Sequence, residues 1–340
     1  MYPVPMPQPP LYNDNVAASN PLRTEQAREL ERYIEHLKTD KSRRISDIKK
    51  LRQRFAESIG WPPPGKPDPK ETASFTQIGE DSLGVYYRAM IPVLPGVHAE
   101  GIYITPKNAT GRVPLVISMH GGGGSPEVAL FNGGGNYHDM VRGGVKNGYA
   151  VFAPQHLFRA DGFPGDIRNR TDERLKLVGT SLTAVEIAKI TRSLDVLLKR
   201  PEIDPKRVAM VGLSYGGYYA LVAPALEPRI KVAVSSCYFG VQEWRYEHDE
   251  LSVPTDFRFP DRFTQLLDSD LVALICPRPL LIQAGKGDDD DHRAGGVKLA
   301  PASAEHYKKV GKGDKFEFLV FEGGHEFHDP SAWAFLKKHL

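Results

Sequence analysis

The chain has 340 residues, of which 41% are hydrophobic and 25% are charged, with a formal net charge of +2. This length can hold one large α/β domain, or one and a half domains of ordinary size. The small net charge excludes the strongly basic surface of a nucleic-acid-binding protein or of one held on an anionic membrane. No apolar run of about 20 residues is present to span a bilayer.

Residues 1–20 are rich in proline and asparagine and have few apolar anchors, so they are expected to form an extended arm. The opening segment Met1–Pro7 lacks the basic and apolar regions of a secretory signal. The chain is therefore expected to be cytoplasmic, or to be a secreted protein supplied without its leader.

Residues 21–59 have the apolar spacing of helices, and the prolines and glycine of residues 62–67 end that pattern. The apolar side chains share a helical face in two groups: Leu30, Tyr33, Ile34 and Leu37, then Ile48, Leu51 and Phe55. This extension is too small for a core of its own, so it is expected to pack against the main domain or a neighbouring subunit. The expected division is residues 1–75 for the arm and helical extension and 76–340 for the main domain.

The main domain alternates strand-like and helix-like segments. Residues 85–90 and 99–104 alternate apolar and polar side chains, as antiparallel edge strands do. Short apolar runs typical of strands buried on both faces follow at residues 115–119, 149–153, 208–211, 232–234, 280–282 and 316–320. The clearest helix between them, residues 187–198, keeps its apolar side chains on one face. Together these segments predict an α/β fold with a mostly parallel, doubly wound sheet.

A glycine-rich loop, His120–Gly124, follows the run at residues 115–119. A phosphate-binding loop would need a lysine, or the G-x-G-x-x-G pattern at a helix start, and neither fits. The better interpretation is half of an oxyanion hole, with the Gly122 N–H as a donor. Each such donor stabilises a transition state by roughly 3–4 kcal/mol.

The segment Gly212–Gly217, with the sequence Gly-Leu-Ser-Tyr-Gly-Gly, lies between the strand-like residues 207–213 and an apolar, helix-compatible stretch. A G-x-S-x-G pattern forms a nucleophile elbow only in this strand–turn–helix context. Its glycines remove Cβ atoms that would collide in so tight a turn. Ser214 is therefore the candidate nucleophile, and the N–H of Tyr215 is the second candidate oxyanion donor.

A serine nucleophile needs a base, and the base needs an orienting acid. Four aspartates, residues 288–291, follow the run at residues 280–282. Asp288 is the candidate acid because it comes first after the strand. Asp289 is the second candidate for the acid, followed by Asp290 and Asp291. Four adjacent carboxylates match poorly the spaced ligands of Ca²⁺, so no metal is expected.

His325 is the candidate base. It follows two glycines in the last loop before a terminal helix at residues 331–340, so the chain order is serine, acid, histidine. The glycines allow the loop to approach Ser214. His328 is the nearby alternative.

With these residues assembled, the chain resembles the α/β-hydrolase superfamily, and more narrowly the dienelactone-hydrolase-like and acetyl-xylan-esterase-like carboxylesterases of bacteria. The resemblance covers about residues 85–340. It is carried by His120–Gly123, Asp204–Arg207, Gly212–Gly217, Cys276–Pro279 and Gly323–His325. The family implies ester hydrolysis through an acyl-enzyme without a cofactor. Dienelactone hydrolases proper use a cysteine nucleophile, whereas this chain has Ser214.

The residues and the resemblance predict a serine carboxylic-ester hydrolase acting on acylated carbohydrates or other small esters. Loops after the strands are expected to contact the substrate through His156 and Arg159, and through Trp244 and Arg245. Trp244 suits stacking on a sugar ring and equally suits simple packing. Arg293 could meet a carboxylated substrate or, more simply, the aspartates beside it.

Two other functions compete with the esterase prediction. A serine peptidase of the prolyl-oligopeptidase type shares the Ser-Tyr-Gly-Gly elbow, but no blade-like repeat precedes this domain. A non-catalytic interaction protein is a third class, which a complete set of triad residues argues against. The expected partners are a small-molecule or carbohydrate ester and, through the N-terminal extension, a second copy of the chain; neither nucleic acid nor a membrane is expected.

Overall fold

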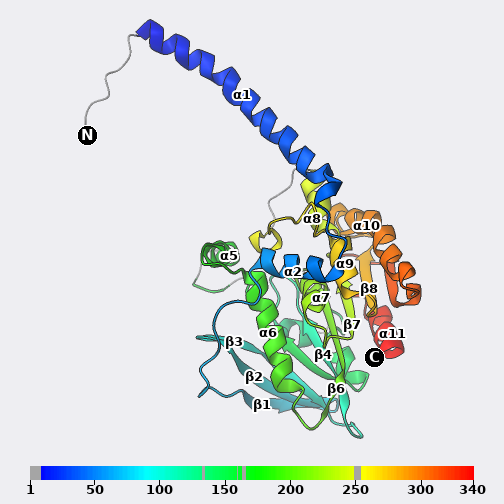
Figure 1. Ribbon diagram of the computed structural model, residues 1–340. Helices are drawn as coiled ribbons and strands as arrows, with labels where there is room; N and C mark the ends of the chain where they lie inside the picture. Colours follow the sequence, from blue (N-terminus) through cyan, green and yellow to red (C-terminus); the bar gives the residue numbers. More distant parts are fainter. Residues whose placement is uncertain (1–8, 132–134, 159, 163–165, 249–253) are drawn as a thin grey trace.

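The computed structural model describes residues 9–131, 135–158, 160–162, 166–248 and 254–340, with side chains from residue 17 onward. A single sheet forms the centre of the fold, helices cover both of its faces, and one long helix projects from the body (Figure 1).

The strands are β1 (Ser74–Glu80), β2 (Gly84–Leu94), β3 (Val97–Pro106), β4 (Val113–Met119), β5 (Ala150–Pro154), β6 (Ile203–Leu213), β7 (Val232–Ser236), β8 (Leu280–Gly285) and β9 (Phe316–Phe321). The α-helices are α1 (Pro9–Thr39), α2 (Ile48–Ile59), α3 (Pro126–Phe131), α4 (Arg142–Lys146), α5 (Ile167–Leu177), α6 (Leu182–Leu197), α7 (Tyr215–Leu226), α8 (Val241–Glu247), α9 (Asp268–Ile275), α10 (Asp290–Lys309) and α11 (Asp329–His339). Three short 3₁₀ helices are η1 (Lys41–Arg43), η2 (Thr255–Phe257) and η3 (Gly313–Lys315).

Within the described residues, the strands lie in one sheet in the order β1-β2-β3-β5-β4-β6-β7-β8-β9. In this order, the pairs β1–β2, β2–β3 and β3–β5 are antiparallel, and every pair from β5–β4 to β8–β9 is parallel. The predicted mostly parallel, doubly wound sheet is therefore confirmed. Because β6, β7, β8 and β9 are parallel neighbours, the loops after them meet at one edge of the sheet.

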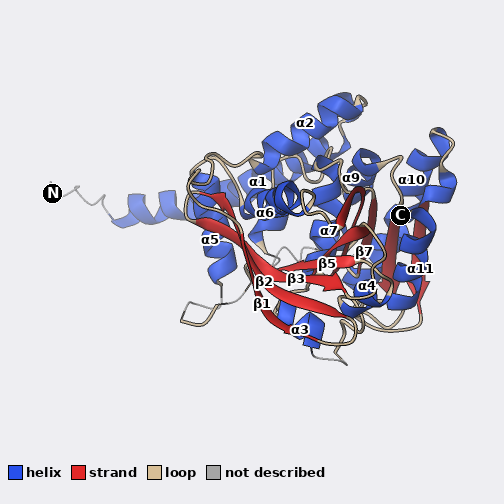
Figure 2. Ribbon diagram, turned by 90° about the horizontal axis from the view of Figure 1, so that it is seen from below, coloured by secondary structure: helices blue, strands red, loops and turns tan. Residues whose placement is uncertain are grey.

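Each face of the sheet carries its own layer of helices and its own hydrophobic core (Figure 2). Helices α2, α6, α7 and α9 contribute to the core on one face, and α3, α4 and α11 to the core on the other. Strands β4, β5, β7 and β8 are buried at every residue. This is why their sequences read as continuous apolar runs.

The expectation of an extended arm over residues 1–20 is wrong for residues 9–20, which belong to α1. Pro9 and Pro10 stand in the first turn, where a missing N–H removes no helical hydrogen bond. Pro21 lies inside the helix and does not end it. Residues 1–8 of the expected arm lie outside the described residues.

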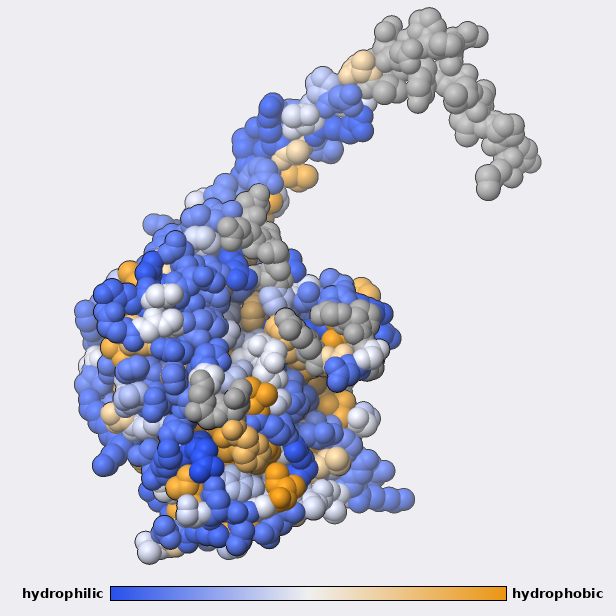
Figure 3. Space-filling view, turned by 180° about the vertical axis from the view of Figure 1, so that it is seen from behind, coloured by the Kyte–Doolittle hydropathy of each residue, from blue (hydrophilic) through white to orange (hydrophobic). Residues whose placement is uncertain are grey.

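Helix α1 leaves the body and has few contacts with it (Figures 1 and 3). Its projecting part is mostly hydrophilic, with isolated apolar side chains; Leu22 is 71% exposed and Leu30 is 58% exposed. Only its last turns approach the body, where Lys38 Nζ lies 4.7 Å from the centre of the Tyr246 ring.

Helix α2 packs against the main domain, which is one of the two arrangements expected for the extension. It begins at the N-cap Asp47, whose side chain accepts from the Lys50 N–H, and ends at Gly60 with φ 69°. Phe55 is fully buried in the same core as α7 and α9. The expected boundary at residue 76 falls inside β1, the strand that forms the antiparallel edge of the sheet.

Within the described residues, no helix is both long and apolar enough to cross a membrane.

Candidate active site

The predicted nucleophile lies at a sharp bend between β6 and α7. Ser214 has φ 57° and ψ −115°, and its N–H donates to the Ser236 carbonyl at 2.7 Å, which ties the bend to β7. A Cβ on Gly212 would collide with the backbone of Gly216, and one on Gly216 with the backbone of Met119. The glycines two residues on either side of Ser214 are therefore required for the turn to close.

Ser214 lines a cavity of about 250 Å³. The cavity is lined by Gly122, Phe158, Arg168, Ser214, Tyr215, Tyr238, Val241, Gln242, Arg245, Pro254, Phe257 and His292. Both residues predicted to donate to an oxyanion are therefore in the same cavity as the predicted nucleophile.

The two predicted oxyanion donors come from different elements. Tyr215 is the first residue of α7, where backbone N–H groups have no partner inside the helix. Gly122 lies in the loop after β4, and no hydrogen bond from its N–H is recorded in the described part of the chain. A Cβ on Gly122 would come within 2.7 Å of the far edge of the Phe158 ring, so that ring would have to shift to make room for it.

The loop that carries Gly122 is braced by two stacked histidines. The rings of His120 and His156 lie 3.7 Å apart with an interplanar angle of 21°. His156 Nε2 donates to the His120 carbonyl at 2.7 Å, and His120 Nδ1 to the Gly121 carbonyl at 2.9 Å. Burial lowers the pKa of His120 to about 4, and burial with the nearby His120 lowers the pKa of His156 well below its usual range. Both rings are therefore neutral near pH 7.

The predicted acid and base are paired. His325 Nδ1 lies 2.9 Å from Asp288 Oδ2 and 3.0 Å from Oδ1. Burial alone would raise the pKa of Asp288, but the hydrogen bond and the charge of His325 outweigh it and lower that pKa. The loops that carry the pair are joined by the Gly287 N–H, which donates to the Gly323 carbonyl at 2.7 Å.

No hydrogen bond between Ser214 and His325 is recorded among the described residues. Such contacts are often long without substrate and tighten in the reacting complex. A second histidine links the two parts of the site, because His292 lines the Ser214 cavity and its ring centre lies 4.5 Å from that of His325.

His292 is a site residue that sequence reasoning missed, and it has its own carboxylate. Its Nδ1 lies 2.7 Å from Asp291 Oδ1, without the geometry of a hydrogen bond among the described residues. Arg245, which also lines the cavity, binds Asp291 at 2.5 Å. Burial would raise the pKa of Asp291, but His292 and Arg245 together lower it to about 2. The signal in the sequence was the position of His292 directly after the four aspartates, which places carboxylates beside its ring.

The sequence analysis also did not predict a buried hydrogen-bond network around Asp256. The Asp256 carboxylate accepts from Arg168 Nη2 at 2.7 and 2.9 Å and from the Tyr215 hydroxyl at 2.9 Å. Arg168 Cζ lies 3.3 Å from the centre of the Tyr215 ring. Burial and the charge of Asp256 raise the pKa of Tyr215 far above its usual value, so its hydroxyl stays protonated. The network fixes the residue whose N–H is the predicted oxyanion donor.

His156 and Trp244, which the sequence predicted as substrate contacts, are not among the residues that line the cavity. His156 is only 1% exposed. Its Nε2 donates to the His120 carbonyl and so supports the loop that carries Gly122. Trp244 lies on α8, where it stacks on His248 at 3.8 Å. Arg159 lies outside the described residues, and Arg293 binds Asp290 at 2.7 Å.

The residues considered as an alternative acid or base make other contacts. Asp289 precedes α10 as its N-cap position, and Asp290 begins that helix. His328 Nδ1 lies 2.7 Å from the Ser331 hydroxyl at the start of α11, and its ring stacks on Phe321.

Two clusters of possible metal-ligating atoms occur at the site within the described residues. One is Cys237, Asp288 and His325, and the other is Asp288, Asp289 and His292; within each, the ligating atoms lie within 4.8 Å of one another. Both clusters share Asp288, which already accepts from His325. Cys237 and Cys276 are free thiols.

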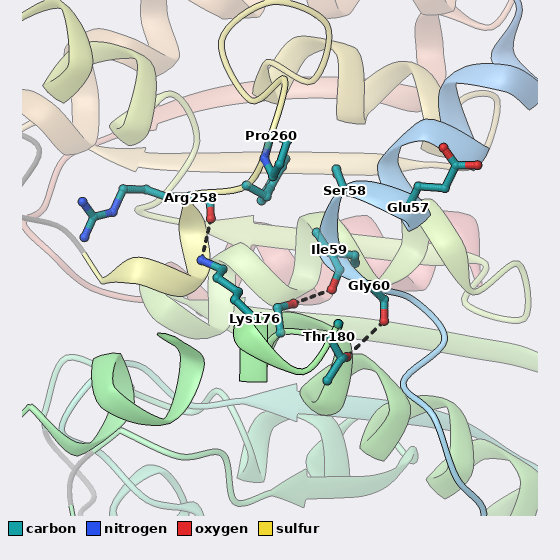
Figure 4. Close-up of a pocket in the computed structure, with 11 residues that line it drawn as sticks. Glu57, Ser58, Ile59, Gly60, Lys176, Thr180, Arg258 and Pro260 are labelled. Carbon is teal, nitrogen blue, oxygen red and sulfur yellow. Dashed lines mark hydrogen bonds between the residues drawn. The ribbon is translucent and has the colours of Figure 1, made fainter. Parts of the chain in front are cut away.

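A larger cavity, of about 540 Å³, lies away from Ser214 (Figure 4). It is formed where the end of α2 meets the loop between α5 and α6 and the segment around Arg258. The Thr180 hydroxyl donates to the Gly60 carbonyl at 3.0 Å, which joins the extension to the main domain (Figure 4). Lys176 Nζ donates to the Arg258 carbonyl at 2.7 Å within the main domain.

Residues 99–260 match the model of the dienelactone hydrolase family. These residues form a dienelactone hydrolase family domain. It contains the predicted oxyanion loop and the elbow, and it ends before the predicted acid and base. The protein named "Putative hydrolase YtaP" from Bacillus subtilis (strain 168) is 25% identical over 240 residues, which cover 67% of this chain and 78% of that protein.

Solved structures share the fold. A glucuronoyl esterase from Solibacter usitatus superposes with a TM-score of 0.61 at 13% identity, over 86% of this chain and 92% of that one. Acetyl xylan esterase 1 from Thermoanaerobacterium sp. JW/SL YS485 superposes with a TM-score of 0.56 at 20% identity, over 87% and 95%. The chain is thus a hydrolase of the dienelactone hydrolase type with an α/β-hydrolase fold.

Proposed function

We propose that this protein is a serine carboxylic-ester hydrolase that works through an acyl-enzyme, on acylated carbohydrates or other small esters. The observation that carries the proposal is the positive φ of Ser214, a residue that lines one cavity together with Gly122 and Tyr215. Strain of this kind persists where it positions a reacting group.

The chemistry follows from the positions of the groups. The Ser214 hydroxyl attacks the ester carbonyl while His325 takes its proton, and Asp288 orients the imidazole and stabilises its cation. The N–H groups of Gly122 and Tyr215 stabilise the oxyanion. His325 then protonates the leaving alcohol, and water activated by the same histidine releases the acid. No step needs a cofactor.

The esterase proposal is tested by the Ser214→Ala variant. Turnover of 4-nitrophenyl acetate should fall by at least about 10³-fold, because the covalent intermediate can no longer form. Ser303→Ala is the matched control: it removes another serine hydroxyl, one that donates to the Leu299 carbonyl in α10, far from the elbow. Circular dichroism should show both variants folded. Substantial hydrolysis by Ser214→Ala would refute the proposal.

A peptidase of the prolyl-oligopeptidase type is distinguished in the same assay. An aminoacyl-proline 4-nitroanilide presents an amide in place of the ester. We expect ester turnover to exceed amide turnover by several orders of magnitude. Comparable catalytic efficiency on the anilide, lost in Ser214→Ala, would assign the peptidase function instead.

A further inference from the structure

Two side chains in the wall of the Ser214 cavity share one carboxylate. Arg245 Nε and Nη2 each lie 2.5 Å from Asp291 Oδ2, and His292 Nδ1 lies 2.7 Å from Asp291 Oδ1. Arg245 and His292 both line the cavity, and their side chains are 25% and 18% exposed. Asp291 therefore has an arginine against one oxygen and an imidazole against the other, and both belong to the wall of the same cavity.

Each of these two side chains keeps a nitrogen that can meet a ligand. Arg245 Nη1 and His292 Nε2 have no hydrogen-bond partner among the described residues. Neither nitrogen is closed off from solvent, whereas His292 Nδ1 is. Nη1 can only donate. In the neutral ring Nε2 accepts, because the ring proton belongs on Nδ1, which faces Asp291 and, at 3.9 Å, Asp288.

The chemistry of the two nitrogens defines the ligand group. A hydroxyl can accept from Arg245 Nη1 and donate to His292 Nε2, and it can still accept from Nε2 when the ring is protonated. An alkyl group would leave both nitrogens without water and without a partner, which costs free energy. A carboxylate fits less well, because Asp291 already neutralises Arg245 and Asp288 lies close to the His292 ring. The pair therefore suits a hydroxyl.

The position of His292 shows which half of an ester meets this pair. Its ring centre lies 4.5 Å from that of His325, the predicted base. The base protonates the oxygen of the leaving alcohol, so that oxygen must lie against the His325 ring. A group on the next carbon of the alcohol is therefore within reach of His292, whereas the ester carbonyl lies at Gly122 and Tyr215.

We propose that Arg245 and His292 recognise a hydroxyl on the alcohol half of the ester, on the carbon next to the acylated one. The inference rests on the proposed function, because it takes Ser214 as the acylated residue and His325 as the base. It narrows the substrate class to esters of vicinal diols and polyols, as opposed to esters of simple alkyl alcohols. Both side chains then determine specificity and take no part in the bond-breaking steps.

The test compares 2-hydroxyethyl acetate with propyl acetate, which differ only by a hydroxyl in place of a methyl group. A pH-stat follows acid release. Each kcat/KM is divided by the rate constant for hydroxide hydrolysis of the same ester, which removes their difference in intrinsic reactivity. Wild-type protein should prefer the hydroxyethyl ester by about tenfold or more, the effect of one well-paired hydroxyl. Arg245→Met and His292→Phe should each lower this preference severalfold, because the hydroxyethyl ester loses more rate than the propyl ester.

The matched control is Arg293→Met, which removes an arginine paired with Asp290 of the same aspartate run and not among the described lining residues of the cavity. Its preference should equal that of wild type, and circular dichroism should show all three variants folded. A wild-type preference near one needs no variant to overturn the inference. A preference that Arg245→Met and His292→Phe leave unchanged would overturn it as well.

Two further substrates separate the remaining outcomes. A larger corrected preference for acetylglycolate, which has a carboxylate in place of the hydroxymethyl group, would overturn the inference, since the pair would then select an anion. Hydrolysis of 4-nitrophenyl acetate without hydrolysis of the hydroxyethyl ester would overturn the inference alone. If wild type hydrolyses none of these esters, it is the proposed function that fails.

Discussion

The backbone of Ser214 combines a positive φ with a ψ of −115°, a conformation that costs a non-glycine residue of the order of 1–3 kcal/mol. The hydrogen bond from its N–H to the Ser236 carbonyl and the absence of Cβ atoms at Gly212 and Gly216 keep the bend closed. The surrounding sheet therefore maintains a strained residue at the position where the hydroxyl must project.

Two histidine–aspartate pairs lie side by side at the candidate site, with their histidine ring centres 4.5 Å apart, and only one can supply the base. We expect His325→Ala to lower kcat by about 10³-fold or more, because Asp288 orients that ring through a 2.9 Å hydrogen bond. His292→Ala should cost less than about tenfold, since its contact with Asp291 lacks hydrogen-bond geometry and cannot fix the ring. Steady-state kinetics with 4-nitrophenyl acetate measures both variants.

If kcat falls further in His292→Ala than in His325→Ala, His292 is the base and His325 is not. The pH dependence of kcat gives an independent check, because removal of the true base abolishes the acidic limb of the profile. Circular dichroism should accompany both variants.

At the scale of elements, the loops after β4 and β5 are joined by the stacked pair His120 and His156. Both have folded-state pKa values below the ordinary 6.5, so the unfolded chain binds more protons than the folded one below that pH. Their stabilisation is complete above pH 6.5 and is lost as the pH falls from 6.5 towards 4. Each proton contributes a slope of about 1.4 kcal/mol per pH unit in the free energy of unfolding.

The His156→Gln variant tests this slope. Its amide can still donate to the His120 carbonyl but cannot titrate, so the fall in unfolding free energy between pH 6.5 and 4 should be shallower by about one proton. Urea unfolding at a series of pH values provides the measurement. An unchanged slope would mean that His156 does not remain neutral in the folded protein.

The sequence predicted those elements whose burial leaves a pattern. The fully buried β4 and β8 read as continuous apolar runs, and the elbow is marked by its glycines. The edge strand β1 was not predicted, because it is exposed at almost every position and its side chains do not alternate between apolar and polar. The first part of α1 was not predicted as a helix, because its proline- and asparagine-rich sequence is typical of an extended arm.

The site was predictable to the extent that chain order fixes it. Ser214, Asp288 and His325 follow β6, β8 and β9, and the parallel pairing from β6 through β7 to β9 brings the ends of these strands to one edge of the sheet. Arg168 and Asp256 are 88 residues apart and come from segments with no motif, so only the folded chain shows that they meet under Tyr215. The sequence likewise offered no means of separating His156, a buried support, from a substrate contact.

For the whole molecule, α1 and α2 play different parts although they are adjacent. Phe55 of α2 is fully buried in the core, whereas Leu22, Leu30 and Tyr33 of α1 are more than half exposed. Deleting residues 1–32 should therefore change the free energy of unfolding by less than about 1 kcal/mol, whereas Phe55→Ala should cost about 3–5 kcal/mol. Urea unfolding compares the two; similar losses would show that α1 is part of the core.

Contact with a second copy through the N-terminal extension stays a prediction. Light scattering on the same deletion variant tests it, because loss of the exposed Leu22 and Leu30 should convert an oligomer into a monomer. An oligomer that survives the deletion would contradict a role for this part of α1.

The measurement closest to the central claim is mass spectrometry of the protein quenched during turnover of a slowly hydrolysed 4-nitrophenyl ester. A covalent intermediate predicts one acyl group per chain, on the peptide that contains Ser214, and its disappearance when the ester is exhausted. Steady turnover with no acylated peptide, or with the acyl group on another residue such as Cys237, would contradict the mechanism.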